Sequence, residues 1–417
     1  MLLIYQLGIA IYALLARCLS LFNSKASEWI KGRKNWRDKF VNQLLTNSKK
    51  RIWFHAASLG EYEMIVPLLE KIDRSKFEII LTFFSPSGYN QKKNSKLADY
   101  VFYLPLDTRK NAADFVKMVN PYFAVFVKYE FWYFYLRELN SKNIPVFLVS
   151  ALFRKDQLFF KSYGSWFKEI LNFFNKIFTM NQSSSEILRI NQINHFIEAG
   201  DLRADRVSDI KIRAEHNSII EAFIQNSLAG IAGSSWHQEE DIISQVINNY
   251  NNLNKWIIVP HDISKEHIKQ IQLKFENSVL YSEFNFELDS NKKVLIIDQI
   301  GLLKSAYKYA YFAIVGGGFR KALHNIFEPA VFEIPVLFGP QLNKHPEGED
   351  LLNAGGALIF NNAKELNNII NKFYSDKVYY NEISASCKKF INKNIGASQS
   401  VMEEVNTILN DEIFTIN

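Results

Sequence analysis

The chain has 417 residues, 48% of them hydrophobic and 14% aromatic, which is enough for two packed domains and argues against disorder. Its net charge of +6 suits a protein that works near anionic lipid or phosphorylated substrates, but without a basic cluster it is no sign of nucleic-acid binding. We therefore expect no nucleic-acid partner. Two cysteines, Cys18 and Cys387, lack metal-ligand spacing and argue against a disulfide framework or a cysteine-based zinc site, which fits a reducing compartment.

The first segment is strongly apolar. From Met1 to Ala16 only Gln6 is clearly polar, and residues 18–22 can extend the run toward the length of a membrane span. It has no early basic segment and no convincing small-residue cleavage site, so we do not predict a removable signal peptide. A surplus of lysine and arginine at positions 25–39 favours the cytoplasmic side. We predict an uncleaved inner-membrane anchor at residues 1–24, spanning the bilayer or lying along it, with the body in the cytoplasm. The alternative is an ordinary first helix buried in the fold.

After the basic stretch, short apolar runs alternate with longer amphipathic segments, which is the pattern of a parallel α/β sheet. The runs expected to form buried strands are 51–57, 77–84, 122–130, 144–152 and 176–181 in the first half, and 228–235, 255–261, 293–298, 311–318 and 334–340 in the second. Between the halves, residues 198–218 are polar and contain no long apolar run. We predict two Rossmann-like, doubly wound α/β domains facing a cleft, at residues 25–205 and 206–417, the second with C-terminal helices.

Glu61 follows the first predicted strand, in the sequence HAASLGEYE. Open α/β sheets bind ligands outside the carboxyl ends of their strands, so a carboxylate here could take the proton of an acceptor hydroxyl. Glu61 also fits a capping box, with Ser58 as the N-cap residue and Glu61 as the third helical residue. Spacing cannot separate the two roles.

Glu130 ends another predicted strand, in KYEFWYF, among aromatic residues. It could be a salt-bridged wall residue, which is the usual case, or a polar group in a mostly apolar acceptor site. Arg203, in AGDLRAD at the domain junction, could bind a phosphate or carboxylate bidentately. A lone arginine is more often a solvated charge.

In the second domain, Gly316, Gly317 and Gly318 end a predicted strand, where backbone could approach a ligand closely. A helix is expected to begin near His324–Asn325, where its free N–H groups would suit a phosphate. Glu328, one turn further on, could accept hydrogen bonds from ribose hydroxyls. A tight turn, followed by an acidic residue that the helix dipole favours, explains these residues equally well.

Two further loops follow strands of the same domain and could line one nucleotide pocket with the triple-glycine loop: Pro260 and His261, and Ile300, Gly301 and Leu302. Ser234, Ser235 and His237 also follow a strand, where a capping serine with acids in the first turn is the commoner explanation. The chain has no HExxH, Walker or Asp-rich metal motif, so nothing in it requires a metal.

Several sequence blocks extend along nearly the whole chain, up to about Phe360: WFHAASLGEYE, FFSPSGY, YLPLD, YEFW, AGDLRAD, AGSSWHQEE, IVGGGF, HNIFEPA and PVLFGP. In this order they resemble the blocks of bacterial 3-deoxy-D-manno-octulosonic acid (Kdo) transferases, membrane-anchored enzymes of lipopolysaccharide inner-core assembly. The resemblance implies a GT-B glycosyltransferase whose N-terminal domain binds the acceptor and whose C-terminal domain binds CMP-Kdo. Such enzymes transfer Kdo to a hydroxyl of the lipid A precursor at the inner membrane surface, with inversion and without a metal or other cofactor.

The resemblance also implies roles for individual residues. Glu61 matches the general base, and Glu130 and Arg203 match residues that assist the transition state, with Arg203 replacing the family's lysine. The residues that match CMP contacts are Pro260, His261, Ile300, Gly301, Leu302, Asn325, Ile326, Phe327 and Glu328.

The chain departs from the family at three places. The usual PRH is PHD here, at Pro260 to Asp262, so an arginine that would hold the CMP phosphate is missing, and Arg320 or Lys321 could replace it. Lys128 replaces a glutamate of the family's ETELWPN, which affects the acceptor side. The loop before His324 reads ALHN in place of GGHN and is expected to be less flexible.

Two other functions compete with Kdo transfer. The first is a GT-B enzyme that uses or epimerises a nucleotide-diphosphate sugar, against which the N-terminal anchor and the SLGE block speak. The second is a membrane-tethered relative that has kept the fold and lost the chemistry. The missing arginine is its best support, and measurable turnover would exclude it.

Overall fold

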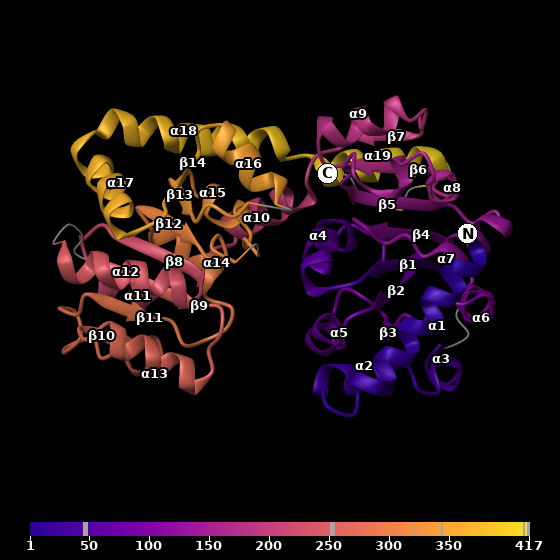
Figure 1. Ribbon diagram of the computed structural model, residues 1–417, viewed down its shortest axis with the longest axis horizontal. Helices are drawn as coiled ribbons and strands as arrows, with labels where there is room; N and C mark the ends of the chain where they lie inside the picture. Colours follow the sequence, from indigo (N-terminus) through magenta and orange to yellow (C-terminus); the bar gives the residue numbers. More distant parts are fainter. Residues whose placement is uncertain (45–48, 251–254, 321, 343–344, 412, 415–417) are drawn as a thin grey trace. The chain divides into compact units, whose positions relative to one another are not determined.

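The computed structural model describes residues 1–44, 49–250, 255–320, 322–342, 345–411 and 413–414. Its contacts divide the chain into two compact units (Figure 1). The first unit consists of Met1–Arg206 and Ile395–Asn417, and the second of Val207–Asn394. Within the described residues, each unit is built on a seven-stranded sheet. The predicted class of two Rossmann-like α/β domains is confirmed, and the cleft between them stays a prediction.

The sheet of the first unit has the strand order β3-β2-β1-β4-β5-β6-β7, and its paired strands are parallel. Its strands are β1 (Lys50–Ala56), β2 (Phe77–Phe83), β3 (Tyr100–Tyr103), β4 (Pro121–Val127), β5 (Val146–Ala151), β6 (Lys176–Thr179) and β7 (Phe196–Glu198). The strand order reverses at β1, which pairs with β2 on one side and β4 on the other. Ligands of open α/β sheets bind outside the carboxyl ends of the strands at such a switch point. The loops after β1 and β4 are therefore placed for a site.

Helices cover both faces of this sheet. They are α2 (Ser24–Arg33), α3 (Trp36–Gln43), α4 (Leu59–Leu69), α5 (Pro86–Lys92), α6 (Arg109–Val119), α7 (Tyr133–Ser141), α8 (Ser165–Leu171), α9 (Gln182–Ile190) and α10 (Leu202–Ile212), which runs into the second unit. Successive side chains of a strand point to opposite faces, so each strand supplies two cores. In β1, Trp53 packs into one apolar cluster, while Ile52 and Phe54 pack into the other.

The sheet of the second unit has the order β10-β11-β9-β8-β12-β13-β14, again with parallel pairs. Its strands are β8 (Ala229–Ser235), β9 (Lys255–Pro260), β10 (Ser278–Leu280), β11 (Val294–Ile296), β12 (Phe312–Val315), β13 (Val336–Phe338) and β14 (Ala357–Ile359). Its helices are α11 (Ser218–Ile224), α12 (His237–Asn249), α13 (Lys265–Lys274), α14 (Leu303–Ala306), α15 (Phe327–Ala330), α16 (Pro346–Asn353), α17 (Ala363–Ser375) and α18 (Lys377–Asn394). The order reverses at β8, so the loops after β8, β9 and β12 meet at its switch point.

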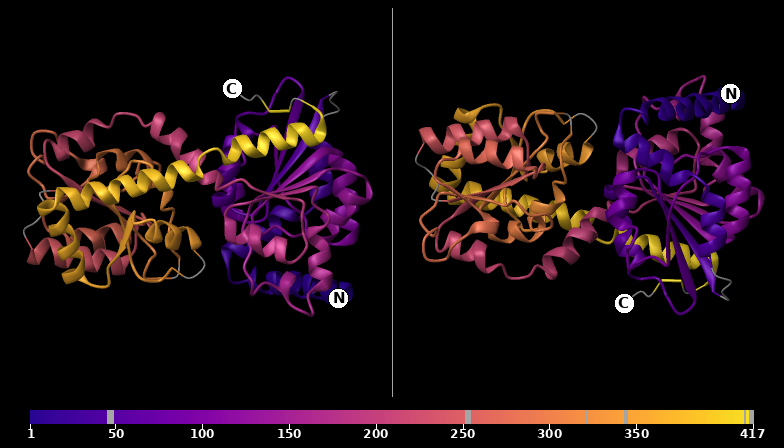
Figure 2. Two further views of the ribbon diagram at one scale, coloured as in Figure 1. Left: turned by 90° about the horizontal axis from the view of Figure 1, so that it is seen from above. Right: turned by 90° about the horizontal axis from the view of Figure 1, so that it is seen from below.

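The last helix, α19 (Ala397–Leu409), corrects the predicted domain limits (Figure 2). We predicted that residues 206–417 form one domain, but Ile395–Asn417 belong to the first unit. Val401, Met402 and Val405 are buried in the apolar cluster that contains Ile52 and Phe54. Asp205 accepts hydrogen bonds from the backbone N–H groups of Gly396 (2.7 Å) and Ser398 (2.6 Å). The apolar face of α19 and this cap hold the end of the chain on the first unit.

The N-terminal helix α1 (Leu2–Leu19) lies along the first unit by one narrow face. The hydroxyl of Tyr5 donates to Asp107 at 2.5 Å, and the Tyr5 ring packs against Tyr133 and Trp166. Among the described residues, α1 is the one helix long and apolar enough to cross a membrane, and no residue of it is buried. The alternative of an ordinary buried first helix is therefore wrong. The exposed apolar side chains of α1 are Leu3, Ile4, Leu7, Ile11, Leu14, Leu15 and Leu19.

Candidate functional site

Glu61 and Glu130 lie at the carboxyl ends of two neighbouring strands of the first unit. Glu61 is in the first turn of α4, which follows β1, and Glu130 lies in the loop between β4 and α7. Because β1 and β4 are paired and parallel, their carboxyl ends lie at the same edge of the sheet. The negative charge of Glu130 acts on the ionisation of Glu61. The structure thus brings together two of the three predicted catalytic residues.

Glu61 is both a capping residue and an unusual acid. The Ser58 hydroxyl accepts a hydrogen bond from the Glu61 N–H at 3.4 Å, as the capping box predicted, and the Glu61 carboxylate accepts one from the Ala57 N–H. Burial and the charge of Glu130 raise the pKa of Glu61 to about 8, although the nearby Lys128 charge opposes the shift. A carboxylate with a pKa near neutrality is well matched to accept a proton in a reaction. The capping position therefore does not exclude a catalytic role.

Glu130 contacts two rings, one from a distant part of the sequence and one two residues away. Its Oε2 atom lies 3.0 Å from His55 Nε2 and accepts a hydrogen bond from Trp132 Nε1 at 2.5 Å. Only 8% of Glu130 is exposed, and His55 is fully buried. The usual interpretation of Glu130, a salt-bridged wall residue, describes its contacts in part. Sequence analysis did not single out His55, although a histidine within a buried apolar strand is a signal that could have been followed.

Arg203, the third predicted catalytic residue, is paired with Asp201. Its Nε atom lies 3.1 and 3.0 Å from the two carboxylate oxygens of Asp201, and Nη2 lies 2.6 Å from one of them. The side chain of Arg203 is only 12% exposed, so Arg203 is not the solvated charge that a lone arginine usually is. Asp201 orients the guanidinium of Arg203 at the start of α10.

Three rings form a stack at the switch point of the second unit. Trp236 precedes α12, His261 follows β9, and His324 precedes α15. Trp236 stacks on His261 with the ring centroids 4.4 Å apart, His261 lies 4.6 Å from His324, and Trp236 Nε1 donates to His324 Nε2 at 3.2 Å. Burial lowers the pKa of His324 to about 4, with smaller contributions from His261 and His345, and burial also lowers the pKa of His261. Both rings are therefore neutral at neutral pH. We did not predict Trp236 or His324 as members of one site.

A cation covers this stack. The guanidinium of Arg320 lies 4.6 Å from the centroid of the Trp236 ring, which in turn stacks on His261. His261 is the position at which the family's PRH arginine would stand. Arg320 thus brings a guanidinium to the Trp236 ring, next to His261 in the stack, from a different loop. Lys321, the other predicted replacement, lies outside the described residues.

The triple-glycine loop is packed against protein backbone. A Cβ atom on Gly316 would lie 1.9 Å from the Ser234 carbonyl oxygen, and one on Gly318 would lie 2.4 Å from the Gly339 nitrogen. Gly317 has a φ of +86°, and its N–H donates to Glu239 at 2.9 Å. The glycines therefore allow close packing of the loops after β8, β12 and β13, which supports the tight-turn alternative. The close approach of a ligand stays a prediction.

The remaining predicted nucleotide contacts stay predictions, and their side chains differ in exposure. Ile300 is 86% exposed, and Gly301, with a φ of +99°, has open space around its α-carbon. The expected helix near His324–Asn325 begins instead at Phe327 and has four residues, because Glu333 in the left-handed conformation and Pro335 follow it closely. The side chains of Ile326 and Phe327 are buried in the core, so a nucleotide contact there would have to come from their backbone groups, and their role stays a prediction.

The other members of the predicted set are polar or lie at loop ends. Pro260 is buried at the end of β9, and Leu302 is the N-cap residue of α14. The side-chain amide of Asn325 makes two hydrogen bonds: its Nδ2 donates to Glu328 at 3.3 Å, and its Oδ1 accepts from the Phe327 N–H at 3.2 Å. Asn325 and Glu328 thus form a small polar pair beside the ring stack.

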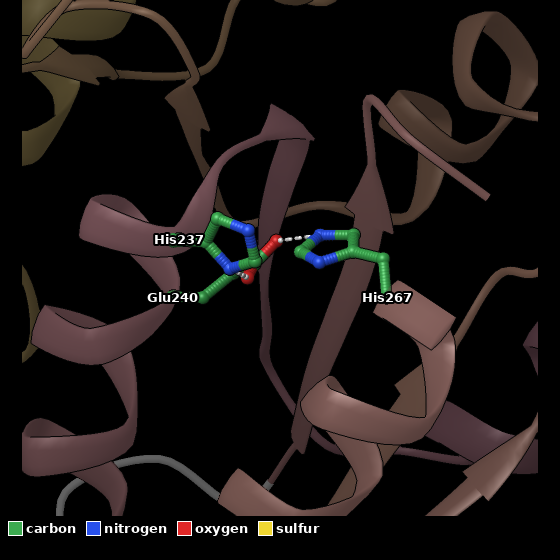
Figure 3. Close-up of side chains that lie close together, drawn as sticks. All are labelled: His237, Glu240 and His267. Atoms are coloured by element: carbon green, nitrogen blue, oxygen red, sulfur yellow. Dashed lines mark hydrogen bonds and ion pairs between the residues drawn. The ribbon is translucent and has the colours of Figure 1, made fainter. Parts of the chain in front are cut away.

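One further cluster in the described part of the second unit could hold a metal ion (Figure 3). His237, Glu240 and His267 place ligand atoms within 4.8 Å of one another. However, the ammonium of Lys274 lies 3.7 Å from the Glu240 carboxylate, and His267 Nε2 lies 3.1 Å from it. These contacts already compensate a buried carboxylate and tie α12 to α13. The prediction that no metal is required stays a prediction.

The two parallel sheets, with polar residues at both switch points, define a GT-B-type α/β protein. Solved structures with this fold include the UDP-N-acetylglucosamine 2-epimerase of Neisseria meningitidis bound to UDP-GlcNAc, with a TM-score of 0.62 and 16% identity over 86% of this chain and 100% of that chain. The 2-epimerase structure from Listeria monocytogenes has a TM-score of 0.61 and 11% identity over 89% and 100%. At these identities the likeness shows the fold alone.

Comparison of sequences is more specific. Residues 34–206 match the family described as 3-deoxy-D-manno-octulosonic-acid transferase (kdotransferase). The chain is 29% identical over 327 residues to the 3-deoxy-D-manno-octulosonic acid transferase of Aquifex aeolicus, covering 76% of this chain and 84% of that protein. It is 24% identical over 369 residues to the enzyme of the same name from Haemophilus influenzae, covering 84% and 86%. The chain is thus similar to Kdo transferases over most of its length.

Proposed function

We propose that this protein transfers Kdo from CMP-Kdo to a hydroxyl of the lipid A precursor, with inversion and without a metal. The observation that carries the proposal is the pair of glutamates at the switch point of the first unit, one of which has a pKa raised to about 8. Similarity to Kdo transferases supports Kdo as the transferred sugar. CMP-Kdo as the donor and the lipid A precursor as the acceptor follow from the resemblance of the sequence blocks.

In the proposed step, Glu61 takes the proton of the acceptor hydroxyl while the acceptor oxygen forms a bond to the anomeric carbon of Kdo. The bond from that carbon to the phosphate oxygen breaks on the opposite face, and its electron pair leaves with CMP. Negative charge grows on the leaving phosphate, so a fixed cation beside it lowers the barrier. We assign this role to Arg320 in the second unit. In the first unit, we assign to Arg203, which Asp201 orients, the stabilisation of negative charge that develops in the transition state.

The test is a transfer assay with the full chain, CMP-Kdo generated in situ, and lipid A precursor in detergent. The expected result is CMP release together with a precursor whose mass has grown by Kdo. UDP-GlcNAc serves as the competing donor, because a protein that acts on nucleotide-diphosphate sugars would turn it over. Turnover of UDP-GlcNAc without CMP-Kdo turnover would contradict the proposal, and absence of any turnover would favour the inactive relative.

Arg320→Ala is expected to weaken CMP binding about tenfold, which corresponds to the loss of one charge-assisted phosphate contact. Titration calorimetry with CMP measures the effect. Arg189→Ala is the matched control, because Arg189 also lies over an aromatic ring, Phe196, but belongs to the first unit. Equal affinity of Arg320→Ala and the unchanged protein would show that Arg320 does not replace the missing arginine.

We further propose that α1 lies along the cytoplasmic surface of the inner membrane. The Tyr5–Asp107 hydrogen bond and the ring contacts of Tyr5 fix one face of α1 to the first unit, while its other sides expose apolar residues. An apolar helix followed by basic residues binds an anionic bilayer in the interfacial plane. This arrangement would hold the candidate site close to an amphipathic acceptor.

The substitutions Leu7→Glu and Ile11→Glu together are expected to shift most of the protein from the membrane fraction to the soluble fraction. Both side chains are exposed, at 61% and 47%, so the fold should tolerate the charges, whereas a charge in the bilayer interface costs binding energy. Sedimentation with vesicles containing anionic phospholipid measures the effect. Leu273→Glu is the control, because Leu273 is an exposed apolar residue of α13, in the second unit. Equal release by the control would contradict the proposal.

A further inference from the structure

His55 has a fixed hydrogen-bond direction. Its Nδ1 atom lies 3.1 Å from the Thr82 carbonyl oxygen and 2.9 Å from the Thr82 hydroxyl. That hydroxyl donates to the Phe54 carbonyl at 3.3 Å and accepts from Trp53 Nε1 at 2.8 Å, so its only hydrogen is used. A carbonyl oxygen can only accept, and Nδ1 must therefore carry a hydrogen and donate it to the Thr82 carbonyl.

Because Nδ1 of His55 carries a hydrogen, the remaining question is where the proton lies in the contact between Nε2 and Glu130. Nε2 of His55 lies 3.0 Å from Glu130, and the contact needs one proton between them. Either the imidazole is a cation and Glu130 a carboxylate, or the imidazole is neutral and Glu130 is protonated. In both cases the pair carries no net charge. Trp132 Nε1 also donates a hydrogen bond to the same oxygen of Glu130, Oε2.

The net charge of the pair matters because Glu61 is close to it. Two charged groups act on the ionisation of Glu61 from the neighbouring loop: Glu130, which opposes it, and Lys128, which favours it. A bare Glu130 would place a full negative charge next to a second carboxylate in a poorly hydrated site. With His55 in place, the proton between His55 and Glu130 offsets part of the charge that opposes ionisation, so Glu61 loses its proton more readily than it would beside a bare carboxylate.

We propose that His55 is a positioning residue that neutralises Glu130 and thereby allows Glu61 to ionise and take the proton of the acceptor. The inference rests on the proposed role of Glu61. It assigns to a buried core histidine a function in the reaction that does not require contact with either substrate.

The test compares the pH dependence of kcat/KM in the full-length protein and in His55→Gln. Glutamine keeps a donor toward Glu130 but cannot carry charge, and the introduced amide and Trp132 then keep Glu130 ionised. The acid limb of the profile is expected to move to higher pH by about one unit or more, the size of shift that a nearby like charge produces. The double substitution His55→Gln with Glu130→Gln makes the pair neutral again, so its acid limb should return toward that of the unchanged protein.

A purely structural role gives different results. Thr82→Val disturbs the same core but keeps the imidazole and the backbone carbonyl at position 82, so it should lower the melting temperature without moving the acid limb. A fall in rate without a shift in His55→Gln, or an equal shift in Thr82→Val, would overturn the inference. If His55→Gln does not fold but the double variant does, the buried uncompensated charge is the cause and the inference holds; if neither folds, His55 is structural and it fails. Activity retained by Glu61→Gln would instead remove the proposed base.

Discussion

Replacing Glu61 by glutamine is expected to lower kcat for Kdo transfer about 10²–10⁴-fold, the usual contribution of a general base. Glutamine has nearly the same shape, and its carbonyl oxygen can still accept the hydrogen bond from the Ala57 N–H, so the helix cap remains. What it cannot do is take a proton from the acceptor. Affinity for CMP should not change, since the donor residues belong to the second unit. The measurement is the rate of CMP release with saturating acceptor.

Stability provides the first control on this variant. Because the pKa of Glu61 is raised to about 8, the folded state binds its proton more tightly than the unfolded chain does. The contribution of Glu61 to stability is therefore present below the ordinary carboxyl pKa and is lost as the pH rises through 8. Glu61→Gln should be at least as stable as the unchanged protein above pH 8. Poor folding of the variant at that pH would show that the cap is its main role.

Glu63→Gln is the matched control for the loss of rate. Glu63 lies two residues further along the same helix and pairs with Lys92 and Arg206. Removing its charge changes an ion-pair network at the same end of α4 but leaves the switch point intact. Activity close to that of the unchanged protein is expected, and a fall as large as that of Glu61→Gln would mean that the position of α4, rather than the base, controls the rate.

Sequence pattern located the interior of both sheets and missed their edges. Each of the ten predicted runs contains a strand that has neighbours on both sides, and such strands are continuous apolar runs because both faces are buried. The four strands that were not predicted, β3, β7, β10 and β14, are the outermost strands and have three or four residues each. An edge strand this short contains too few apolar residues to stand out from a loop.

The residues of the candidate sites likewise divide into those that the sequence pattern indicated and those that it did not. Glu61 and Glu130 could be found because each follows a strongly apolar strand, and the parallel pairing of β1 and β4 brings them together. The stack of Trp236, His261 and His324 joins three loops, and nothing in one loop's sequence indicates the other two. Ile326 and Phe327 were predicted as contacts from the family block, whereas their apolar side chains pack into the core.

The second large effect is expected from a substitution in the C-terminal helix α19, and it concerns the stability of the first unit. Val405→Asp is expected to destabilise the first unit by about 3–5 kcal/mol, because it removes a buried apolar side chain and places an unpaired charge in the core. Val405 is fully buried in α19, in the cluster that contains Ile52, Phe54 and Leu68. Loss of α19 would therefore uncover the face of the sheet on which α4, the helix that contains Glu61, also packs. Urea unfolding measures the loss of stability.

Hydrogen exchange shows which unit is affected. Amides of β1 and β4 should lose protection in Val405→Asp, while those of β8 and β9 should keep it, because α19 packs in the first unit although it follows the second in sequence. Gln399→Asp is the control, since it puts the same charge on the exposed side of the first turn of α19, where the helix dipole favours it. Lost protection in β8 and β9 with β1 unchanged would return residues 395–417 to the second domain, as the sequence alone predicted. Lost protection in β1 would instead mean that α19 stabilises the sheet of the first unit, from which the Glu61 loop extends.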